Sequence, residues 1–286
     1  MPRASSDRLF MWAGGKTKLL SHYRPLLPDD VHSRRLYEPF AGGAALFNAL
    51  SENKIIDAHL SDVNGEIIRL FKMVRDNPEY LITLMRDQEE KWLPLDKEGR
   101  KKLYYELRKE YWGLDEGEEA TAALYFLMKT GFNGIWQTCK ASKGRYGTPV
   151  GLANQKTAVF DADTVRNWSA KLSNTDLACC GYEQVDVTPE AFVFCDPPYR
   201  DSFTSYGTDF GDDQQVKLIE WCRTAHKTAG ATVWLSNRDA GDGFFEDHAP
   251  EATIHRFPVT YTAGRRKKTE DGFEAKPATE VLLVWS

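Results

Sequence analysis

The fold of this 286-residue chain is constrained most by five consecutive apolar residues, Ala191-Phe192-Val193-Phe194-Cys195. A strand exposed on one face alternates apolar and polar residues, whereas this run is apolar at every position. It therefore predicts a strand buried on both faces, which is typical of a parallel sheet covered by helices. Asp196 and two prolines end the run. Ligands of open α/β sheets bind beyond the carboxyl ends of the strands, so we expect a binding site directly after Cys195.

Other segments of the chain switch between strand-like and helix-like periods. Helical periods fill the stretch from about 65 to 130, and strand-like runs are expected at 36–40, 55–60, 176–180, 231–235, 254–262 and 280–285. We predict an α/β fold in three parts: residues 1–64 and 158–286 form the main domain, and residues 65–157 form a helical insertion with a hairpin loop. One continuous α/β domain with long helices is the alternative that periodicity leaves open.

The segment Asp196-Pro197-Pro198-Tyr199 has a composition suited to holding an amine. A residue before proline is kept extended, so the Asp196 carboxylate and the Pro197 carbonyl should point at one fixed position. Two acceptors there can each take one hydrogen of an amino group, which makes the nitrogen lone pair more available for attack on a methylsulfonium. Tyr199 offers an aromatic face to a base taken out of its duplex. The alternative is a strand that ends in an ordinary proline turn.

A cosubstrate site is indicated by two segments that end earlier strand-like runs. The first is Glu38-Pro39-Phe40-Ala41-Gly42-Gly43, whose small residues permit close approach of the backbone to a bound nucleoside. The second follows about 20 residues later and contains Asp62, which can accept hydrogen bonds from ribose hydroxyls. Their order and spacing match the binding site of a nucleoside cosubstrate.

The N-terminal segment Trp12-Ala13-Gly14-Gly15-Lys16-Thr17 contains Gly-Lys-Thr, which also occurs in the phosphate-binding loops of nucleoside triphosphatases. Such a loop needs a glycine where this chain has Phe10, so we exclude that class. Two interpretations of Lys16 remain open. Either it binds the carboxylate of a methionine moiety under cover of Trp12, or it is a surface lysine whose stem lies along a core tryptophan.

Composition indicates a globular protein without a membrane span. Hydrophobic residues make up 42% and charged residues 28% of the chain, and no apolar run has the length of a membrane helix. No apolar segment follows the N-terminus, so we expect a cytoplasmic protein. The five cysteines have neither disulfide nor zinc-ligand spacing. We therefore expect no metal and reduced, mostly buried thiols.

A net charge of -5 is not typical of a nucleic-acid-binding protein, so any DNA-binding surface must be local. Two short basic groups qualify. One consists of Lys140, Lys143 and Arg145, and the other is Arg265-Arg266-Lys267-Lys268. For either group, a solvated surface loop is the alternative.

Taken in order, five motifs of the chain resemble the Dam-like family of adenine-specific DNA methyltransferases, in its alpha-class order. They are Trp-Ala-Gly-Gly-Lys, Glu-Pro-Phe-x-Gly-Gly, Ser-Asp-Val-Asn, Phe132-Asn133-Gly134 and Asp-Pro-Pro-Tyr, and they span nearly the whole chain. The resemblance implies the Rossmann-like fold of a methyltransferase, with a seven-stranded sheet, and an activity that depends on S-adenosylmethionine. It also implies that the helical insertion recognises double-stranded DNA and that the target adenine is flipped out. No membrane and no obligatory protein partner are implied.

The same resemblance assigns roles to individual residues. The implied contacts of S-adenosylmethionine, the methyl donor, are Trp12, Lys16, Glu38, Phe40, Asp62, Tyr182 and Asp196. The implied catalytic residues, which hold the adenine, are Asp196, Pro197, Pro198 and Tyr199. The expected DNA contacts are Met11, Phe132, Asn133, Gln137, Lys140, Lys143, Arg145, Arg265, Arg266, Lys267 and Lys268.

Two of these positions depart from the family members that recognise GATC. Those members have a lysine and an arginine that read guanine, where this chain has Met11 and Gln137. Methionine donates no hydrogen bond to guanine, and glutamine pairs better with adenine, so we predict that GATC is not the preferred site. Phe132 and Asn133 are expected to fill the space left by the flipped base. The alternative is a glycine-rich turn with a buried Phe132.

Other methyl transfers fit the sequence less well. Methylation of cytosine carbon 5 needs a cysteine after a proline, and no Pro-Cys pair exists. Methylation of the cytosine exocyclic amine uses a related motif, but an aspartate at its first position favours adenine. A protein-glutamine or RNA amine methyltransferase more often begins the motif with asparagine. A catalytically silent DNA-binding module on the same fold is the alternative from another class, and the intact pair of acceptors argues against it.

Overall fold

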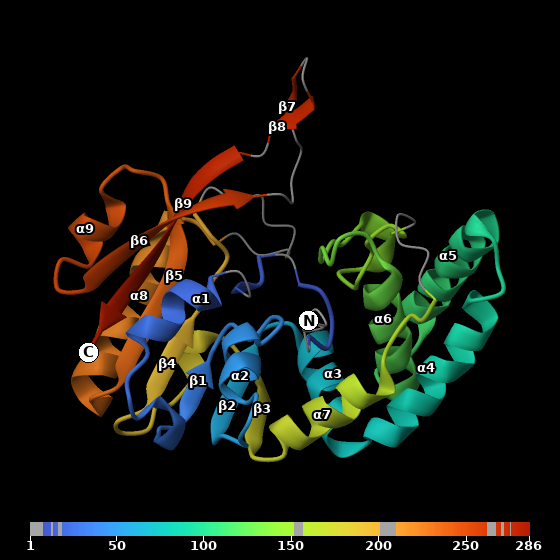
Figure 1. Ribbon diagram of the computed structural model, residues 1–286, viewed down its shortest axis with the longest axis horizontal. Helices are drawn as coiled ribbons and strands as arrows, with labels where there is room; N and C mark the ends of the chain where they lie inside the picture. The colour runs from blue at the N-terminus through green and yellow to red at the C-terminus, as the bar shows by residue number, and fades with distance from the viewer. Residues whose placement is uncertain are drawn as a thin grey trace, which may run out of the picture.

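The computed structural model describes residues 8–12, 14–16, 19–151, 157–200, 210–261, 267–269, 272–274 and 276–286, with only the backbone described within 260–276. Its centre is a seven-stranded sheet in the order β3-β2-β1-β4-β5-β9-β6 (Figure 1). The strands are β1 (Leu36–Glu38), β2 (Ala58–Asp62), β3 (Thr175–Cys179), β4 (Phe192–Cys195), β5 (Thr232–Asp239), β6 (Thr253–Tyr261) and β9 (Lys276–Trp285). The predicted α/β fold with a seven-stranded sheet is confirmed.

The five strands from β3 to β5 pair in parallel, and β9 then runs antiparallel between β5 and β6. Parallel neighbours need crossover connections, which helices supply here. The α-helices are α1 (Leu20–Tyr23), α2 (Ala45–Leu50), α3 (Gly65–Asp76), α4 (Pro78–Trp92), α5 (Lys97–Gly113), α6 (Glu118–Thr130), α7 (Ala162–Leu172), α8 (Asp212–Ala229) and α9 (Phe244–His248). Short 3-10 helices are η2 (Arg24–Leu26), η3 (Val31–Ser33), η4 (Lys140–Ser142) and η5 (Tyr182–Gln184).

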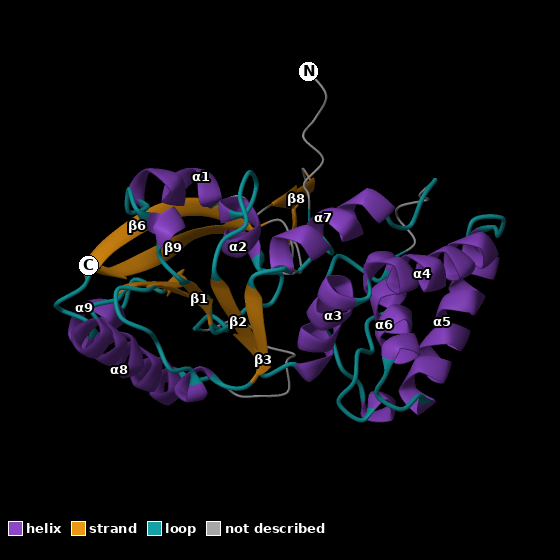
Figure 2. Cartoon of the chain, turned by 90° about the horizontal axis from the view of Figure 1, so that it is seen from below, coloured by secondary structure: helices purple, strands orange, loops and turns teal. Residues whose placement is uncertain are grey.

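Helices cover both faces of the sheet, as Figure 2 shows. The side chains of β4 alternate between two hydrophobic clusters. Phe192 and Phe194 belong to the cluster that includes residues of α1, α2, α3 and α7. Val193 and Cys195 belong to the cluster that includes residues of α8 and α9. This burial on both faces explains why the run has no polar residue.

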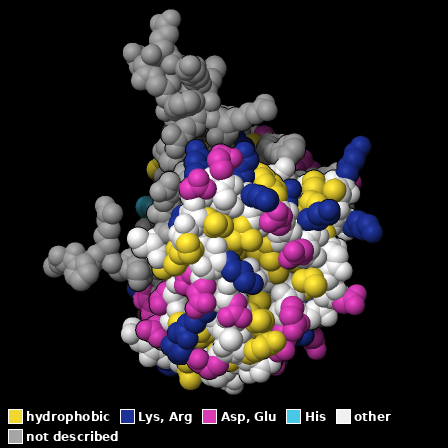
Figure 3. Space-filling model, turned by 90° about the vertical axis from the view of Figure 1, so that its right-hand side faces the viewer, with side chains coloured by type: hydrophobic (Ala, Val, Ile, Leu, Met, Phe, Trp, Pro, Cys, Tyr) yellow, Lys and Arg dark blue, Asp and Glu magenta, His cyan; other side chains and the backbone are white. Residues whose placement is uncertain are grey.

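Helices α3 to α6 lie between β2 and β3 in the chain, within the predicted insertion. Asn64 caps α3 by accepting a hydrogen bond from the Glu66 backbone at 3.1 Å. Helix α6 is buried along most of its length because α3, α4 and α5 surround it. Figure 3 shows the outer side of these helices, where charges of both signs are interspersed with apolar side chains. One hydrophobic cluster joins the helices to the sheet, and the boundaries at 65 and 157 stay a prediction.

The carboxyl ends of neighbouring parallel strands bring the predicted site residues together. Glu38 ends β1, Asp62 ends β2, and Asp196 follows β4 directly. The hairpin of β7 (Lys267–Thr269) and β8 (Gly272–Glu274) lies uppermost in Figure 1, and the loop after α6 lies at the upper end of the helices on the right.

Candidate active site

Lys16 and Asp196 form the charged centre of the site. The Asp196 Oδ1 atom lies 2.5 Å from the Lys16 Nζ atom. The ammonium also donates a hydrogen bond to the Gly14 carbonyl at 3.0 Å. Only 3% of the Lys16 side chain is exposed, so its interpretation as a surface lysine is wrong. The sequence did not indicate that this lysine pairs with the aspartate.

Burial governs the ionisation of Asp196. It raises the pKa of the carboxyl group to about 6, while the charge of Lys16 limits that rise and the charge of Glu280 adds to it. A hydrogen bond with Ser236 also favours the charged form. At neutral pH the group is therefore mostly a carboxylate, which can accept hydrogen bonds from an amine.

The Tyr199 ring is held at its hydroxyl end. The hydroxyl donates a hydrogen bond to the Glu280 carboxylate and lies 3.0 Å from the Ser236 Oγ atom. Burial raises the pKa of Tyr199 well above its ordinary value, so the hydroxyl keeps its proton at neutral pH. The Lys16 Nζ atom lies 4.5 Å from the ring centroid, within cation–π range. The orientation of the ring is thus set by the protein itself.

Sequence reasoning missed the roles of Ser236 and Glu280. Both side chains are buried, and they come from the neighbouring antiparallel strands β5 and β9. Tyr23 of α1 also donates to Ser236 at 3.3 Å. The available signal was a charged residue at the start of the strand-like run 280–285. Nothing in that local pattern related it to Asp196, because the contact depends on the order of the strands.

A clamp of two buried amides holds the segment 196–199 from the side of α8. Proline has no backbone N–H, so Pro197 and Pro198 cannot be held by backbone donors of their own. Gln215 donates from Nε2 to the Pro198 carbonyl at 2.8 Å. Asn237 donates to the Gln215 Oε1 atom at 2.9 Å and accepts from the Arg200 backbone at 3.2 Å. Both amide side chains are fully buried, so we name Gln215 and Asn237 the amide clamp.

The Arg200 side chain anchors the end of the same segment. Its guanidinium forms ion pairs with Asp212 at 2.8 Å and Asp242 at 3.0 Å. The guanidinium carbon also lies 3.8 Å from the centroid of the Phe244 ring. Only 6% of the arginine side chain is exposed, whereas its two carboxylate partners lie at the surface, and together these contacts hold Arg200 at the start of the loop between β4 and α8.

Asp62 and Trp12 contact the glycine loop, which contains Gly42 and Gly43 and follows β1, from two sides. Asp62 accepts from the Gly42 backbone through Oδ2 and from the Asn64 backbone through Oδ1, each at 2.9 Å. Gly42 has a φ of 45°, and a Cβ atom there would lie 2.7 Å from the Trp12 Nε1 atom. Trp12 therefore packs directly on the loop. Each Asp62 oxygen retains a further lone pair, which a ribose hydroxyl can use.

Phe40 and Tyr182 form an aromatic wall beside this loop. Their ring centroids are 5.5 Å apart and their planes nearly parallel. Phe210 meets the Phe40 ring edge-on at 5.8 Å. The wall joins the end of β1 to the η5 segment after β3, so the fold brings together two predicted cosubstrate residues that are far apart in sequence.

The Glu38 carboxyl group makes a structural contact within the protein itself. Its Oε1 atom accepts a hydrogen bond from the Phe47 backbone at 2.5 Å, near the start of α2. Burial raises the pKa of Glu38 to about 8, an effect that the Phe47 hydrogen bond partly offsets and the charge of Asp196 increases. The group is therefore mostly protonated at neutral pH. This contact fixes the strand end on which the glycine loop begins.

Several predicted DNA contacts are exposed to solvent. Met11 is 49% and Phe132 is 44% exposed, so a buried Phe132 is wrong. Asn133 adopts a left-handed backbone with φ 53° at the turn. A Cβ atom on Gly134 would lie 2.6 Å from the Met11 Cβ atom, which shows how closely the two segments pack. Three further predicted DNA contacts are also exposed, namely Gln137, Lys140 and Lys143.

Arg145, in contrast, is directed into the protein. Its Nε atom donates to the Glu66 carboxylate at 3.0 Å, and its Nη1 atom donates to the carbonyls of Tyr111 and Leu114. The guanidinium carbon lies 4.0 Å from the centroid of the Tyr111 ring. Protein groups occupy the guanidinium in this structure, and the expected DNA contact at Arg145 stays a prediction.

The comparisons with known proteins agree with this geometry. Residues 12–261 match the model of the D12 class N6 adenine-specific DNA methyltransferases. The chain belongs to this family. The type II methyltransferase M.MjaIII of Methanocaldococcus jannaschii is 36% identical over 242 residues, which are 79% of this chain and 82% of that protein. The DNA adenine methylase of Vibrio cholerae is 27% identical over 82% of each chain. The Retron Ec67 DNA adenine methylase of Escherichia coli is 27% identical over 96% of this chain and 90% of that protein.

The protein is thus an N6 adenine-specific DNA methyltransferase, a transferase whose relatives include type II methyltransferases and DNA adenine methylases. Family membership does not favour the cytosine-amine or silent-module alternatives. Of the basic group at 265–268, Arg265 and Arg266 lie outside the described residues. Lys267 and Lys268 lie in the β7 strand of the methyltransferase.

The cysteines of the methyltransferase correct one expectation. All five are free thiols, but only Cys195 and Cys222 are buried, while Cys139 and Cys179 are exposed. The prediction that most are buried is therefore wrong. Within the described ranges, no His, Cys, Asp or Glu cluster could hold a metal ion. No helix in the described part of the chain is long and apolar enough to cross a membrane.

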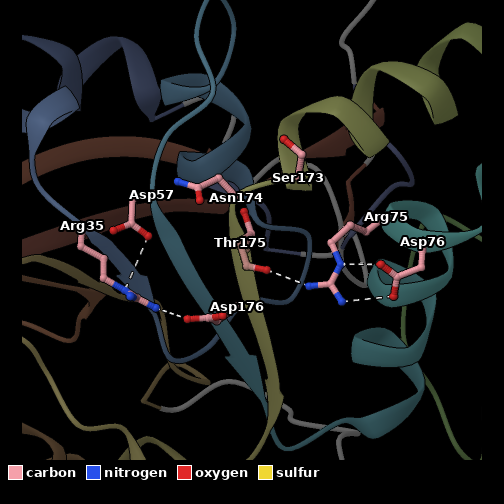
Figure 4. A pocket seen from close by; sticks show the side chains of 8 residues that line it. All are labelled: Arg35, Asp57, Arg75, Asp76, Ser173, Asn174, Thr175 and Asp176. Atoms are coloured by element: carbon pink, nitrogen blue, oxygen red, sulfur yellow. Dashed lines mark hydrogen bonds and ion pairs between the residues drawn. The ribbon is translucent and has the colours of Figure 1, made fainter.

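A surface hollow of about 720 Å³ lies at the amino ends of β1 and β3, away from the active site of this methyltransferase (Figure 4). Its two arginines are already paired. Arg35 contacts Asp176, and Arg75 contacts Asp76 at 2.8 Å. With its cations neutralised in this way, the hollow contributes no residue to the site.

Proposed function

We propose that S-adenosylmethionine binds between Trp12, Lys16, Asp62 and the aromatic wall, and that it supplies an electrophilic methyl group there. The observation that supports this is the close packing of Trp12 on the glycine loop, where a Cβ atom on Gly42 would lie 2.7 Å from the Trp12 Nε1 atom. Phe40 and Tyr182 offer an apolar surface to an adenine ring, and Asp62 offers acceptors to ribose hydroxyls. Lys16 would bind the carboxylate of the methionine moiety and would give up part of its contact with Asp196 to do so.

The Asp196 carboxylate and the Pro197 carbonyl would hold the target adenine by its exocyclic amine. Each acceptor takes one amine hydrogen, so the nitrogen lone pair is directed at the methyl carbon. The nitrogen–carbon bond forms as the carbon–sulfur bond breaks. The surplus amine proton then passes to Asp196, whose pKa of about 6 allows the group to take it up and return it to water. Tyr199 provides the ring beside the base.

Double-stranded DNA is the proposed substrate, acting through the exposed surface of Met11 and the loop after α6. Phe132 and Asn133 would enter the space left by the flipped adenine, and Lys140 and Lys143 would contact phosphates. Met11 and Gln137 replace guanine-reading cations, so the preferred site is not GATC. A cytoplasmic location, where DNA is accessible, is part of the same proposal.

The catalytic part is tested by labelled methyl transfer to duplex DNA. Asp196→Ala should abolish incorporation. Asp57→Ala removes an exposed carboxylate just before the amino end of β2, away from the site, and should leave incorporation unchanged. Equal incorporation by wild type and Asp196→Ala would remove Asp196 from the mechanism. Calorimetry tests the cosubstrate site, where unchanged affinity for S-adenosylmethionine in both Asp62→Ala and Lys16→Ala would rule the pocket out.

The target site is tested by mapping methyladenine after expression in a host free of methylation. We expect modification in a context other than GATC, or at adenines with weak selectivity. Strong methylation confined to GATC would contradict the roles given to Met11 and Gln137.

A further inference from the structure

One face of α5 carries a row of hydrogen-bond donors, which we call the ladder. The donors bond to residues 146–148, the returning arm of the loop after α6. Tyr104 donates to the carbonyl of residue 148 at 2.8 Å. Arg108 donates from Nη1 to the carbonyls of residues 147 and 148 at 2.7 and 3.1 Å. Trp112 donates to the carbonyl of residue 146 at 2.9 Å. The three donors are four residues apart, so they lie on one face of the helix and meet three consecutive carbonyls.

Arg108 is oriented by aromatic neighbours on its own helix. Its guanidinium carbon lies 4.6 Å from the centroid of Tyr105 and 4.8 Å from the centroid of the Trp112 ring. A planar guanidinium can stack against rings and donate in its own plane at the same time, which an ammonium cannot do. The side chain therefore arrives at the loop in a fixed orientation. It makes two hydrogen bonds there, and no acidic side chain in the described part of the chain forms an ion pair with it.

The returning arm in turn holds residues 135–137, the outgoing arm of the same loop, through hydrogen bonds at Gln137 and Ile135. The Gly147 backbone donates to the Gln137 carbonyl at 2.6 Å. The Gln137 backbone donates to the Thr148 Oγ1 atom at 3.2 Å, and that hydroxyl donates to the Ile135 carbonyl at 2.6 Å. Both backbone groups of Gln137 are thus bonded to the two residues that Tyr104 and Arg108 hold. The exposed Gln137 side chain takes its position from α5.

We propose that Tyr104, Arg108 and Trp112 are positioning residues that determine sequence specificity without contacting DNA. The inference rests on the proposed function, in which the loop reads base edges. Hydrogen bonds weaken steeply with angle, so a reading side chain must be held within a fraction of an ångström. The ladder supplies that constraint to Gln137. The residues of the ladder do not touch Asp196, Asp62 or Lys16, so chemistry and cosubstrate binding do not depend on it directly.

The decisive variant is Arg108→Met, which keeps much of the side-chain length and loses the donors. The readout is the ratio of methylation rates at the most-preferred site and at sites with one changed base pair, measured on a library of duplexes. We expect this ratio to fall at least about tenfold, a loss within the range that one good base contact supplies. Affinity for S-adenosylmethionine should change less than about twofold, and Arg108→Lys should restore part of the ratio.

Two parallel variants separate the possible outcomes. Lys109→Met removes a neighbouring cation from the exposed side of α5 and should leave the ratio unchanged. Tyr104→Phe removes one hydroxyl from the ladder with little change in shape and should lower the ratio even if Arg108→Met folds poorly. If Gln137→Ala leaves the ratio unchanged, the proposed reading by the loop is wrong. If Gln137→Ala lowers it while Arg108→Met and Tyr104→Phe do not, the inference about α5 is overturned.

Discussion

Replacing Glu38 by glutamine should stabilise the protein, and the gain should grow as the pH rises. The carboxyl group is 2% exposed and accepts one backbone hydrogen bond from Phe47. Burial raises its pKa from 4.5 to about 8. Glutamine keeps an acceptor oxygen for Phe47 and never takes a charge. It therefore imitates the protonated glutamate that the native fold prefers.

The sign and size of the effect follow from proton binding. Between the two pKa values the native protein holds a proton on Glu38 that the unfolded chain has released, so the free energy of unfolding falls as pH rises. Each pH unit within that window is worth about 1.4 kcal/mol. Between about pH 5 and pH 7, the wild type should lose about 2.5 kcal/mol relative to Glu38→Gln, because the unfolded state begins to release its proton near pH 4.5.

The assay is urea unfolding followed by tryptophan fluorescence at several pH values from 5 to 7. Glu52→Gln is the matched control, because Glu52 lies on the surface with 54% of its side chain exposed. Its unfolding free energy should track the wild type across the series. The reasoning is refuted if the difference between Glu38→Gln and the wild type is constant with pH, or if it shrinks as pH rises.

Three further predictions concern the site. Methyl transfer should fall as pH drops below about 6, because protonated Asp196 is a weaker acceptor for its amine hydrogen and cannot take up the surplus proton; a rate that is flat from pH 7 to pH 5 would contradict its role. Gln215→Leu removes the donor to Pro198 and should lower kcat at least about tenfold with nearly unchanged affinity for S-adenosylmethionine, whereas an unchanged kcat would show that the amide clamp is dispensable. Gly42→Ala should weaken S-adenosylmethionine binding and cost about 1 to 3 kcal/mol of stability, because its φ is positive and its Cβ meets Trp12. Gly113→Ala, which meets nothing within 4 Å, is its control in calorimetry and thermal melts, and equal behaviour of the two would refute the steric argument.

The sequence predicted more of the fold than of the site. The apolar run before Asp196 identified a buried parallel strand, and the residues that follow it lie at a carboxyl edge as expected. Lys140, Lys143 and Arg145 could not be distinguished in sequence, yet the first two are exposed and the third is paired with Glu66. Their difference arises from α3 and α5, which reach the loop only in the folded chain.

By itself, the sequence determined the order of elements and the chemistry that each motif can offer. Both follow from local properties: the period of apolar residues, the rigidity of proline and the donors and acceptors of each side chain. Tertiary structure alone decided that Lys16 pairs with Asp196, that Glu280 holds Tyr199, and that the amide clamp fixes a segment without backbone donors. These contacts join residues far apart in the chain. Burial sets their strength and ionisation, and it depends on every element packed around them.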